Sequence, residues 1–282
     1  MRVLLLGATG MLGRAFHSLL SAAGAQVDTP SERDFDLRHP PAIAKGVDLV
    51  ICCAAYTDVD GAEENEELAT AVNGAGVGEL AKRSLDALVP LINFGTDYVF
   101  SGDASSPYSR DAEHVPLNAY GRSKAAGEVA LAASGAEYLQ VRTSWLYAPW
   151  GNNFLRTMAR LTAERDSLQV VDDQRGRPTS AEHLARTTLA LFRKGARGIH
   201  HATDGGECTW FDFACFIRDE LGHACTIEPC TSDAFPRPAK RPSYSVLDIA
   251  ETERLIGPLR PWQESAATVL RRLPPETIDR ST

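Results

Sequence analysis

The sequence predicts an α/β protein with a doubly wound parallel sheet, covered by helices on both faces, and a smaller C-terminal domain. Short apolar runs alternate with helix-like stretches through the first half of the chain. These runs are apolar at nearly every position, as in strands that are buried on both faces of a parallel sheet. The 282 residues exceed the usual size of one compact domain, so we expect two lobes with a cleft between them.

The elements follow one another in a regular order. The first apolar run, Arg2–Leu6, leads through a glycine-rich turn into 11–23, where apolar residues recur at helical spacing. This order of strand, turn and helix is then repeated. Further strands are expected at 26–29, 48–54, 89–94 and 138–142, and helices at 63–86 and 118–133.

After residue 150 the pattern is less regular. The segment 232–245 contains three prolines among basic residues, which is typical of a loop. We expect residues 1–150 to form the sheet domain, with about 180–204 returning to it, and 151–282 to form the smaller, substrate-binding domain. The elements expected here are helices at 153–164, 181–194 and 210–221, strands at 168–171 and 198–201, and short helices after Val246 and Trp262.

Composition and charge exclude several classes of protein. The net charge is −8 with a pI of about 5.4, and no block of Lys or Arg occurs, so we expect no nucleic-acid partner. No apolar stretch is long enough to span a bilayer, and glycines break the opening run, so we expect neither a membrane protein nor a signal peptide. The six cysteines include no Cys-x-x-Cys pair and the seven histidines are scattered, which favours reduced thiols, a cytoplasmic location and no metal site.

A glycine-rich turn connects the first strand to the first helix. Gly7, Gly10 and Gly13 follow the pattern Gly-x-x-Gly-x-x-Gly. Glycines allow a tight turn and a close approach of the backbone to a pyrophosphate, while the helix N-terminus offers N–H donors to phosphates. Glycine turns also occur for purely structural reasons, but this one directly follows an apolar strand. The pattern therefore predicts a Rossmann-like domain that binds NADH or NADPH.

Two pairs of side chains indicate carbonyl chemistry. Tyr120 and Lys124 are four residues apart at the start of an expected helix, so they share one face, although a solvated helix face is the alternative. The ammonium group is expected to lower the pKa of the tyrosine toward the working range, and the same lysine can bind ribose hydroxyls. Thr96 and Asp97 end the fourth strand, at the edge of the sheet where ligands bind. Thr96 can donate a hydrogen bond to a carbonyl oxygen on which negative charge develops.

Motifs in the order of a known family run from residue 7 to residue 248. They are GATGMLG, AAYTDVDGAE, GTDYVFSG, PLNAYGRSKAAGE, RTSWLY with GNNF, DDQRGRPT and RPAKRPSYSVLD. With these motifs the chain resembles the dTDP-4-dehydrorhamnose reductases, which are extended short-chain dehydrogenases/reductases. The resemblance implies an enzyme that takes hydride from NAD(P)H and reduces the C4 ketone of dTDP-4-dehydro-6-deoxy-L-hexose (dTDP-4-dehydrorhamnose) to dTDP-L-rhamnose.

The resemblance also implies the residues of the site. The catalytic residues would be Thr96, Tyr120 and Lys124. The cofactor contacts would be Gly7, Thr9, Gly10, Met11, Leu12, Gly13, Asp36, Leu37, Ala54, Ala55 and Tyr56, together with Tyr120 and Lys124. The sugar contacts would be Val59, Thr96, Asp97, Tyr98 and Trp145, whose indole can pack on a pyranose face. Basic and amide side chains that can bind the substrate diphosphate are Asn152, Asn153 and Arg241, the last in a loop with Arg237 and Lys240.

The chain departs from the family pattern at two positions. Gly95 stands where the motif commonly has serine, so we expect a hydroxyl to be missing beside the site and the orientation of the sugar to be affected. Ala15 stands where some relatives have a glutamate that takes part in a metal-bridged dimer contact. We therefore expect no structural magnesium and either a monomer or a homodimer.

The choice between NADH and NADPH stays open in the sequence. Asp28, near the end of the second strand, can accept a hydrogen bond from a ribose 2′-OH and repel a 2′-phosphate, which favours NADH. If that strand runs on to Pro30, then Ser31 and Arg33, with Arg14, can hold the phosphate of NADPH instead.

Two other functions fit the same features. One is a non-catalytic relative, such as the regulatory subunit of methionine adenosyltransferase, although intact Thr96, Tyr120 and Lys124 favour an enzyme. The other is a nucleotide-sugar epimerase or a different 4-ketoreductase of deoxysugar biosynthesis, which would share the fold and the catalytic groups.

Overall fold

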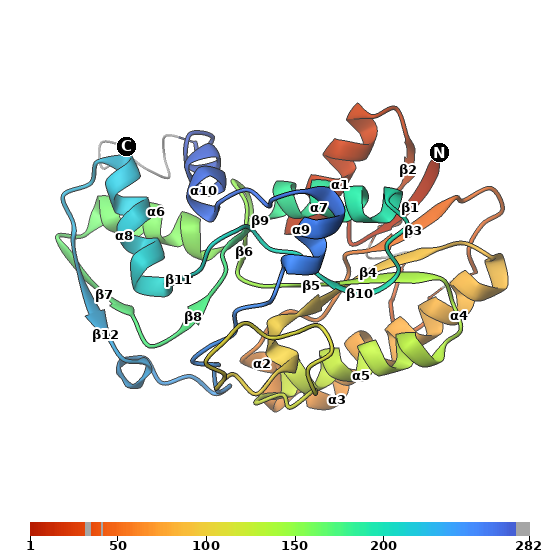
Figure 1. Ribbon diagram of the computed structural model, residues 1–282, viewed down its shortest axis with the longest axis horizontal. Coiled ribbons are helices and arrows are strands. Elements are labelled where there is room, and N and C mark those ends of the chain that lie inside the picture. The colour runs from red at the N-terminus through yellow and green to blue at the C-terminus, as the bar shows by residue number, and fades with distance from the viewer. Residues whose placement is uncertain (32–34, 41, 275–282) are drawn as a thin grey trace.

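The computed structural model describes residues 1–31, 35–40 and 42–274, and these residues form a six-stranded parallel sheet (Figure 1). The strand order is β10-β5-β4-β3-β1-β2, and every neighbouring pair is parallel. The chain moves outward in one direction from β1 and in the other from β3, so the doubly wound sheet predicted from the sequence is confirmed. The strands are β1 (Arg2–Leu6), β2 (Gln26–Asp28), β3 (Leu49–Cys52), β4 (Leu91–Thr96), β5 (Tyr138–Thr143) and β10 (Gly198–His201).

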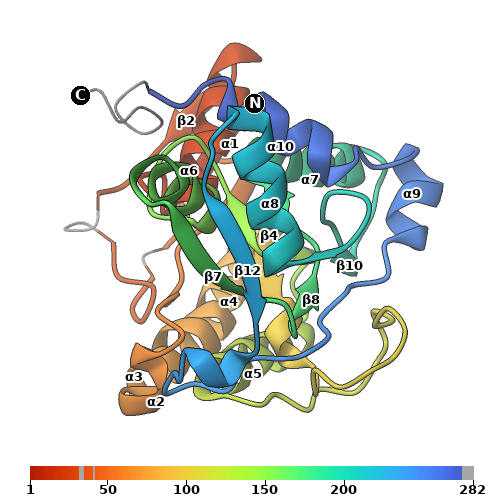
Figure 2. The same cartoon turned by 90° about the vertical axis from the view of Figure 1, so that its left-hand side faces the viewer.

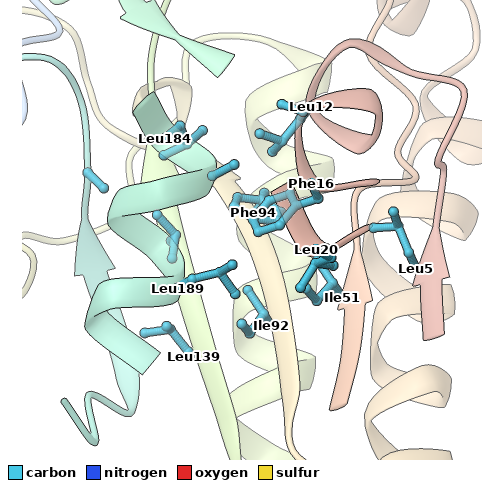
Figure 3. Packing of buried hydrophobic residues seen from close by; sticks show 14 of the residues in the cluster. Leu5, Leu12, Phe16, Leu20, Ile51, Ile92, Phe94, Leu139, Leu184 and Leu189 are labelled. Atoms are coloured by element: carbon cyan, nitrogen blue, oxygen red, sulfur yellow. The ribbon is translucent and has the colours of Figure 1, made fainter. Parts of the chain in front are cut away.

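Helices cover both faces of the sheet. On one face lie α1 (Met11–Ala22) and α7 (Ala181–Arg193), and on the other lie α4 (Val77–Ala87) and α5 (Ala119–Ala133). Large apolar side chains repeat at four-residue spacing along α1, which gives it one stripe for burial against the sheet. The buried residues labelled in this core in Figure 3 are Leu5, Leu12, Phe16, Leu20, Ile51, Ile92, Phe94, Leu139, Leu184 and Leu189.

The expectation of one helix over 63–86 is wrong. Two short helices, α2 (Gly61–Glu64) and α3 (Glu66–Thr70), are followed by a π-helical turn at Ala71–Gly76. In this turn the buried Asn73 side chain bonds the backbone of Tyr56 at both its N–H and its carbonyl, each at 2.9 Å. A π turn changes the direction of a side chain within a helix, and here it places the amide against the loop that follows β3.

The smaller lobe lies to the left of the sheet in Figure 1 and faces the viewer in Figure 2. Its core joins α6 (Phe154–Glu164), α8 (Trp210–Leu221) and α10 (Trp262–Leu270) around the buried Phe213. Of its short strands the apolar pattern predicts only β7, because two-residue strands show no period and β12 contains a proline. The pairs are β7 (Ser167–Val171) with β12 (Thr226–Cys230), β8 (Arg175–Gly176) with β11 (Cys208–Thr209), and β6 (Leu146–Tyr147) with β9 (Thr179–Ser180).

The chain passes between the two lobes more than once. α7 and β10 come after elements of the smaller lobe, yet β10 forms the edge of the sheet beside β5. α9 (Ala250–Ile256) then packs against α7. The two lobes are therefore not consecutive pieces of the chain. Among the described residues no helix combines the length and the apolar character needed to cross a membrane.

Candidate active site

A cavity of about 1030 Å³, here called the sheet cavity, opens at the carboxyl ends of the parallel strands. Its wall includes residues that directly follow β1, β3 and β5, and the last residues of β4. It runs from Gly7 at one end to Trp145 and Trp210 at the smaller lobe. The strand order reverses between β1 and β3, which is where open α/β sheets bind their ligands.

The glycine turn forms one end of the sheet cavity. Gly7 has a φ of 73°, and a Cβ at this position would lie 2.6 Å from the backbone nitrogen of Ala54. A Cβ on Gly13 would overlap the carbonyl oxygen of Gly7, so glycine is needed for α1 to begin this close to β1. None of the described residues in the first turn of α1 is acidic, so the positive end of this helix favours an anion. The turn therefore fits the diphosphate of a dinucleotide.

The start of α5 is held on two sides, which fixes where Tyr120 lies. The Asn118 side chain accepts a hydrogen bond from the N–H of Gly121 at 2.8 Å and so caps the helix. The carboxylate of Glu63 accepts another from the first N–H of the helix, also at 2.8 Å. Tyr120 and Lys124, one turn apart, both line the sheet cavity.

The ionisation of Tyr120 differs from the expectation. Burial raises its pKa to about 12, the charge of Asp97 acts in the same direction, and a hydrogen bond with Thr96 opposes them. Lys124 donates to the carbonyl oxygen of Phe94 at 2.7 Å, and burial lowers the pKa of Lys124. The prediction that Lys124 brings the tyrosine pKa down is therefore wrong for this structure. Tyr120 is a protonated phenol at neutral pH, which is the form that can give a proton to an alkoxide.

Thr96 and Asp97 lie where β4 ends, and both line the sheet cavity. Thr96 donates to Asp97 Oδ1 at 3.0 Å and accepts from the N–H of Tyr98 at 3.2 Å. Burial raises the pKa of Asp97 to about 6, against the effect of hydrogen bonds from the hydroxyls of Ser245 and Thr96. Two hydroxyls, those of Thr96 and Tyr120, thus lie together where a carbonyl oxygen could be bound.

Most of the predicted cofactor contacts lie along the same cavity. Those that line it are Gly7, Thr9, Gly10, Met11, Leu12, Asp36, Leu37, Ala54, Ala55, Tyr120 and Lys124. Gly13 and Tyr56 are not part of the lining. Tyr56 packs beside Tyr120 against the same buried alanines, so it supports the tyrosine instead of facing the cavity. Hydrogen bonds from Arg38 lower the pKa of Asp36 to about 2, so this carboxylate is charged at the adenosine end.

The end of β2 bears on the choice of cofactor. The strand stops at Asp28, and Asp28 Oδ2 accepts from Arg2 Nε at 2.6 Å. Asp28 is not among the residues that line the sheet cavity, whereas Arg14 and Ser31 are. Arg33 lies outside the described residues. The carboxylate that would have favoured NADH is therefore engaged elsewhere.

The predicted sugar contacts Val59, Thr96, Asp97, Tyr98 and Trp145 line the sheet cavity, as does Asn152. Asn153 does not. Its side chain accepts from the N–H of Arg156 at 3.1 Å, which caps α6, and donates to the carbonyl of Ala148 at 2.9 Å. The structure therefore gives Asn153 a local structural role, and no part of it reaches the cavity wall.

A second cavity of about 1320 Å³, here called the lobe cavity, lies between β7, α6 and the loop 235–241. Arg237, Lys240 and Arg241 line it. Arg241 is paired with Asp60 of the sheet lobe, because its Nη1 and Nη2 lie 3.0 Å from Oδ1 and Oδ2 of that carboxylate. Although partial burial acts in the opposite direction, these bonds lower the pKa of Asp60. Asp60 escaped the sequence analysis because an acidic residue before a helix is usually solvated.

The position of Gly95 corrects another expectation. A Cβ there would lie 2.5 Å from Oε1 of Glu128, 2.7 Å from Nε2 of Gln140 and 2.9 Å from Cγ of Arg142. A serine side chain would therefore enter a buried polar cluster, not the sugar side of the cavity. In this cluster Arg142 donates to Glu128 at 2.6 Å. Burial alone would raise the pKa of Glu128, but hydrogen bonds from His114 and Arg142 lower it to about 2.

A doubly wound sheet with a glycine turn, a Tyr-x-x-x-Lys helix and a threonine at the end of β4 defines an NAD(P)-dependent oxidoreductase of the extended short-chain class. The comparisons with known proteins narrow this class. The family model described as RmlD substrate binding domain matches residues 1–274, and the chain belongs to this family.

Three relatives show how closely the chain follows the family. A dTDP-4-keto-6-deoxy-D-glucose reductase of Streptomyces niveus is 40% identical over 269 residues, which are 93% of each chain. The crystal structure of a dTDP-4-dehydrorhamnose reductase of Clostridium acetobutylicum has a TM-score of 0.91 and 38% identity, covering 96% of this chain and 99% of that one. A dTDP-4-dehydrorhamnose reductase of Bacillus anthracis, solved in complex with NADP, has a TM-score of 0.89 and 32% identity, with 96% and 99% covered. The family indicated by the sequence motifs is confirmed.

Proposed function

We propose that this protein reduces the C4 ketone of dTDP-4-dehydro-6-deoxy-L-hexose to dTDP-L-rhamnose with NAD(P)H. One observation carries the proposal: Thr96 and Tyr120 meet in the cavity that begins at the glycine turn and ends at the smaller lobe. A dinucleotide that enters at the turn and a sugar that enters from the smaller lobe would meet at these two hydroxyls. The names of the relatives support a nucleotide-linked keto sugar as the substrate.

The chemistry divides between the cofactor and three side chains. NAD(P)H bound in the sheet cavity would supply the hydride that the carbonyl carbon receives. The Thr96 hydroxyl, whose single proton is directed at Asp97 Oδ1 in the structure, would turn to the carbonyl oxygen and stabilise the negative charge that develops there. Tyr120, which is protonated because its pKa is about 12, gives its proton to the nascent alkoxide. Lys124 is buried and lines the cavity, where its ammonium can bind ribose hydroxyls.

The substrate is proposed to span both cavities. The hexose would lie in the sheet cavity beside Val59, Asp97 and Trp145, and the nucleotide would lie in the lobe cavity. Arg241 stands at the border of the lobe cavity, and its guanidinium suits the diphosphate between the two parts. Asn152 is a further candidate from the sheet side.

For the cofactor we propose a preference for NADPH. Asp28 is bonded to Arg2, whereas Arg14 and Ser31 line the adenosine end of the sheet cavity. The Arg14 guanidinium lies 4.8 Å from the ring centroid of Trp150 and is thereby held near the turn. A cation in this place suits a 2′-phosphate.

The test uses dTDP-4-keto-6-deoxyglucose with and without a 3,5-epimerase, and follows NAD(P)H absorbance. A rhamnose-forming reductase should consume NAD(P)H only with the epimerase, because only then does the acceptor have the L configuration. The C4 configuration of the product, read by NMR, completes the assignment. Equal consumption without the epimerase would refute the rhamnose assignment.

A second candidate is reduction of the D-configured keto sugar. The Streptomyces niveus relative, at 40% identity, carries that activity in its name. The same assay separates the two, because this enzyme would be fast without the epimerase. Retention of NAD⁺ through purification would instead indicate an epimerase. A non-catalytic role would require that no nucleotide keto sugar causes NAD(P)H oxidation.

We further propose a cytoplasmic enzyme that acts as a monomer or a homodimer without structural magnesium. The cysteines of the described residues are free, which supports a reducing compartment. Ala15 is 3% exposed and belongs to the sheet core, so its side chain offers no ligand to a metal. Light scattering on a sizing column, with and without Mg²⁺, tests the last two points, since a magnesium-dependent dimer would contradict them.

A further inference from the structure

Trp210 occupies a place that the proposed catalytic groups do not explain. It begins α8, directly after the capping residue Thr209, and lines both the sheet cavity and the lobe cavity. Among the described residues, only Tyr98 shares this property. The two cavities therefore meet between Tyr98 and Trp210, and a ligand that occupies both must pass this point.

Trp210 also forms the support of Trp145. The two indoles are stacked with their ring centroids 3.5 Å apart and their planes 9° from parallel. Trp145 is one of two described non-glycine residues with positive φ, at 46°, so its backbone is held in a conformation that costs free energy. Two contacts help to hold Trp145 in this conformation. They are the stack of its indole on Trp210 and a hydrogen bond from the N–H of Thr179 to its carbonyl at 3.1 Å.

Besides the stack on Trp145, two contacts fix Trp210 itself. Its Nε1 donates to Oε1 of Gln174 at 3.2 Å, and Nε2 of Gln174 donates in turn to Oγ of Ser232 at 2.9 Å. The ring of Phe154 lies 4.5 Å away, centroid to centroid, and links Trp210 to the core of the smaller lobe. The plane of the Trp145 indole is consequently set by the smaller lobe, although Trp145 follows β5 of the sheet.

Gly176 completes the arrangement. A Cβ on Gly176 would lie 2.5 Å from Cε2 and 2.8 Å from Nε1 of Trp145, so only a glycine lets β8 run this close to the indole. Gly176 pairs with Cys208 in the strand that leads into Trp210. Trp145 is therefore packed between β8 and α8, and what it offers to the cavity is the part that these two elements leave uncovered.

We propose that Trp210 is a positioning and specificity-determining residue, which orients a nucleotide-linked hexose by holding Trp145 and by forming one wall of the passage between the two cavities. The inference rests on the proposed function, because it requires that the sugar and the nucleotide occupy different cavities. Trp210 touches the reacting atoms only through Trp145. Its loss should therefore misplace the hexose while leaving the cofactor and the nucleotide bound.

The experiment compares three variants of the full-length protein. Trp210→Leu removes both the stack and the N–H donor, whereas Trp210→Phe keeps an aromatic ring on Trp145 and loses only the donor to Gln174. Phe211→Leu is the matched control, because Phe211 is the next residue of α8 and lines neither cavity. Two indoles stacked this closely couple their electronic transitions, so circular dichroism reports the stack directly, independently of activity.

Binding of dTDP-L-rhamnose and of thymidine diphosphate is then measured by calorimetry, and binding of NADPH by its fluorescence. For Trp210→Leu we expect the affinity for dTDP-L-rhamnose to fall about tenfold or more and kcat for the keto sugar to fall similarly, because a small misplacement of the reacting carbon is costly. Affinities for thymidine diphosphate and NADPH should change less than about twofold. Trp210→Phe should recover most of both losses, and Phe211→Leu should behave as the wild type.

The outcomes separate the inference from the proposed function. A wild-type protein that binds no dTDP-linked sugar would overturn the proposed function. A wild-type protein that binds and reduces it, with Trp210→Leu unchanged in both respects, would overturn only the role of Trp210. Equal losses for thymidine diphosphate, NADPH and the sugar would likewise overturn it, because they would show general damage. Should Trp210→Leu fail to fold, Trp210→Phe still tests the inference. A loss of sugar affinity in this variant, which keeps an aromatic ring on Trp145, would overturn a role that acts through the stack.

Discussion

Asp60 and Arg241 join the two lobes through a bidentate ion pair, although they are 181 residues apart in the sequence. The same carboxylate also accepts from the N–H of Ala239 at 3.2 Å, and Asn118, which caps α5, donates to the carbonyl of Lys240 at 2.9 Å. The loop that borders the lobe cavity is thus fastened to the part of the sheet lobe that carries Tyr120.

Arg241→Ala should raise the KM for the nucleotide sugar about tenfold and weaken the salt dependence of binding, because a guanidinium near the diphosphate is lost. Arg237→Ala is the comparison. The Arg237 side chain is 65% exposed and lies 3.7 Å from Asp60, farther than Arg241 does at 3.0 Å, so the effect of its loss should be smaller. Steady-state kinetics at several salt concentrations measure both. An unaltered KM in Arg241→Ala would show that the loop does not bind the phosphates.

Tyr120→Phe should lower kcat on the order of a hundredfold or more, because the proton donor to the alkoxide is removed. The affinity for NADPH should change little, since Lys124 stays in place. The measurement pairs turnover with a fluorescence titration of NADPH. A kcat close to that of the wild type would show that another group supplies the proton.

Asp97→Asn should change how stability depends on pH. The pKa of Asp97 is raised from 3.8 to about 6 in the folded protein, so this group contributes full stability below 3.8 and loses it as the pH rises through about 6. The loss is on the order of 3 kcal/mol. Urea unfolding at pH values on both sides of this window should show that wild type and variant differ more in stability at high pH, in favour of the variant. A constant difference across the window would contradict the raised pKa.

Gly95→Ser should lower stability and leave sugar selectivity unchanged, because the added side chain meets Glu128 and Gln140 instead of the substrate. We expect a loss of about 1–3 kcal/mol, as for other overpacked sites. Urea unfolding measures the loss, and the ratio of kcat/KM for epimerised and non-epimerised keto sugar measures selectivity. A stable variant with altered selectivity would place the hydroxyl on the sugar side after all.

Arg14→Ala should raise the KM for NADPH about tenfold and leave that for NADH nearly unchanged, because only NADPH has a 2′-phosphate to bind. Asp28→Asn is the control, since Asp28 bonds Arg2 and does not line the cavity. Its KM for NADH should stay as in the wild type. Equal losses for the two cofactors in Arg14→Ala would argue against a 2′-phosphate site.

The parts of the site that could be predicted from the sequence are those whose residues are close together in the chain. The glycine turn is one short motif between a strand and a helix, and Tyr120 and Lys124 are one helical turn apart, so local geometry determines their arrangement. Thr96 could be placed because strand ends in a parallel sheet share one edge. The same reasoning predicted the doubly wound sheet.

The remaining features depend on contacts between distant segments. Nothing near Trp210 in the sequence indicates that it stacks on Trp145, and nothing near Asp60 indicates that it pairs with Arg241. The pKa of Tyr120 could not be predicted either, because it follows from how deeply the folded protein buries the phenol. The sequence likewise could not show that a side chain at position 95 would point toward Glu128 and away from the sugar, because Glu128 is distant in the chain.

The return of the chain to the sheet has a consequence for how the protein can be divided. Because β10 is the outer neighbour of β5, a fragment that stops before β10 would expose a row of unpaired backbone groups along β5. Such an edge is a template for association with other chains. A protein cut at residue 150 should therefore aggregate instead of yielding two soluble halves.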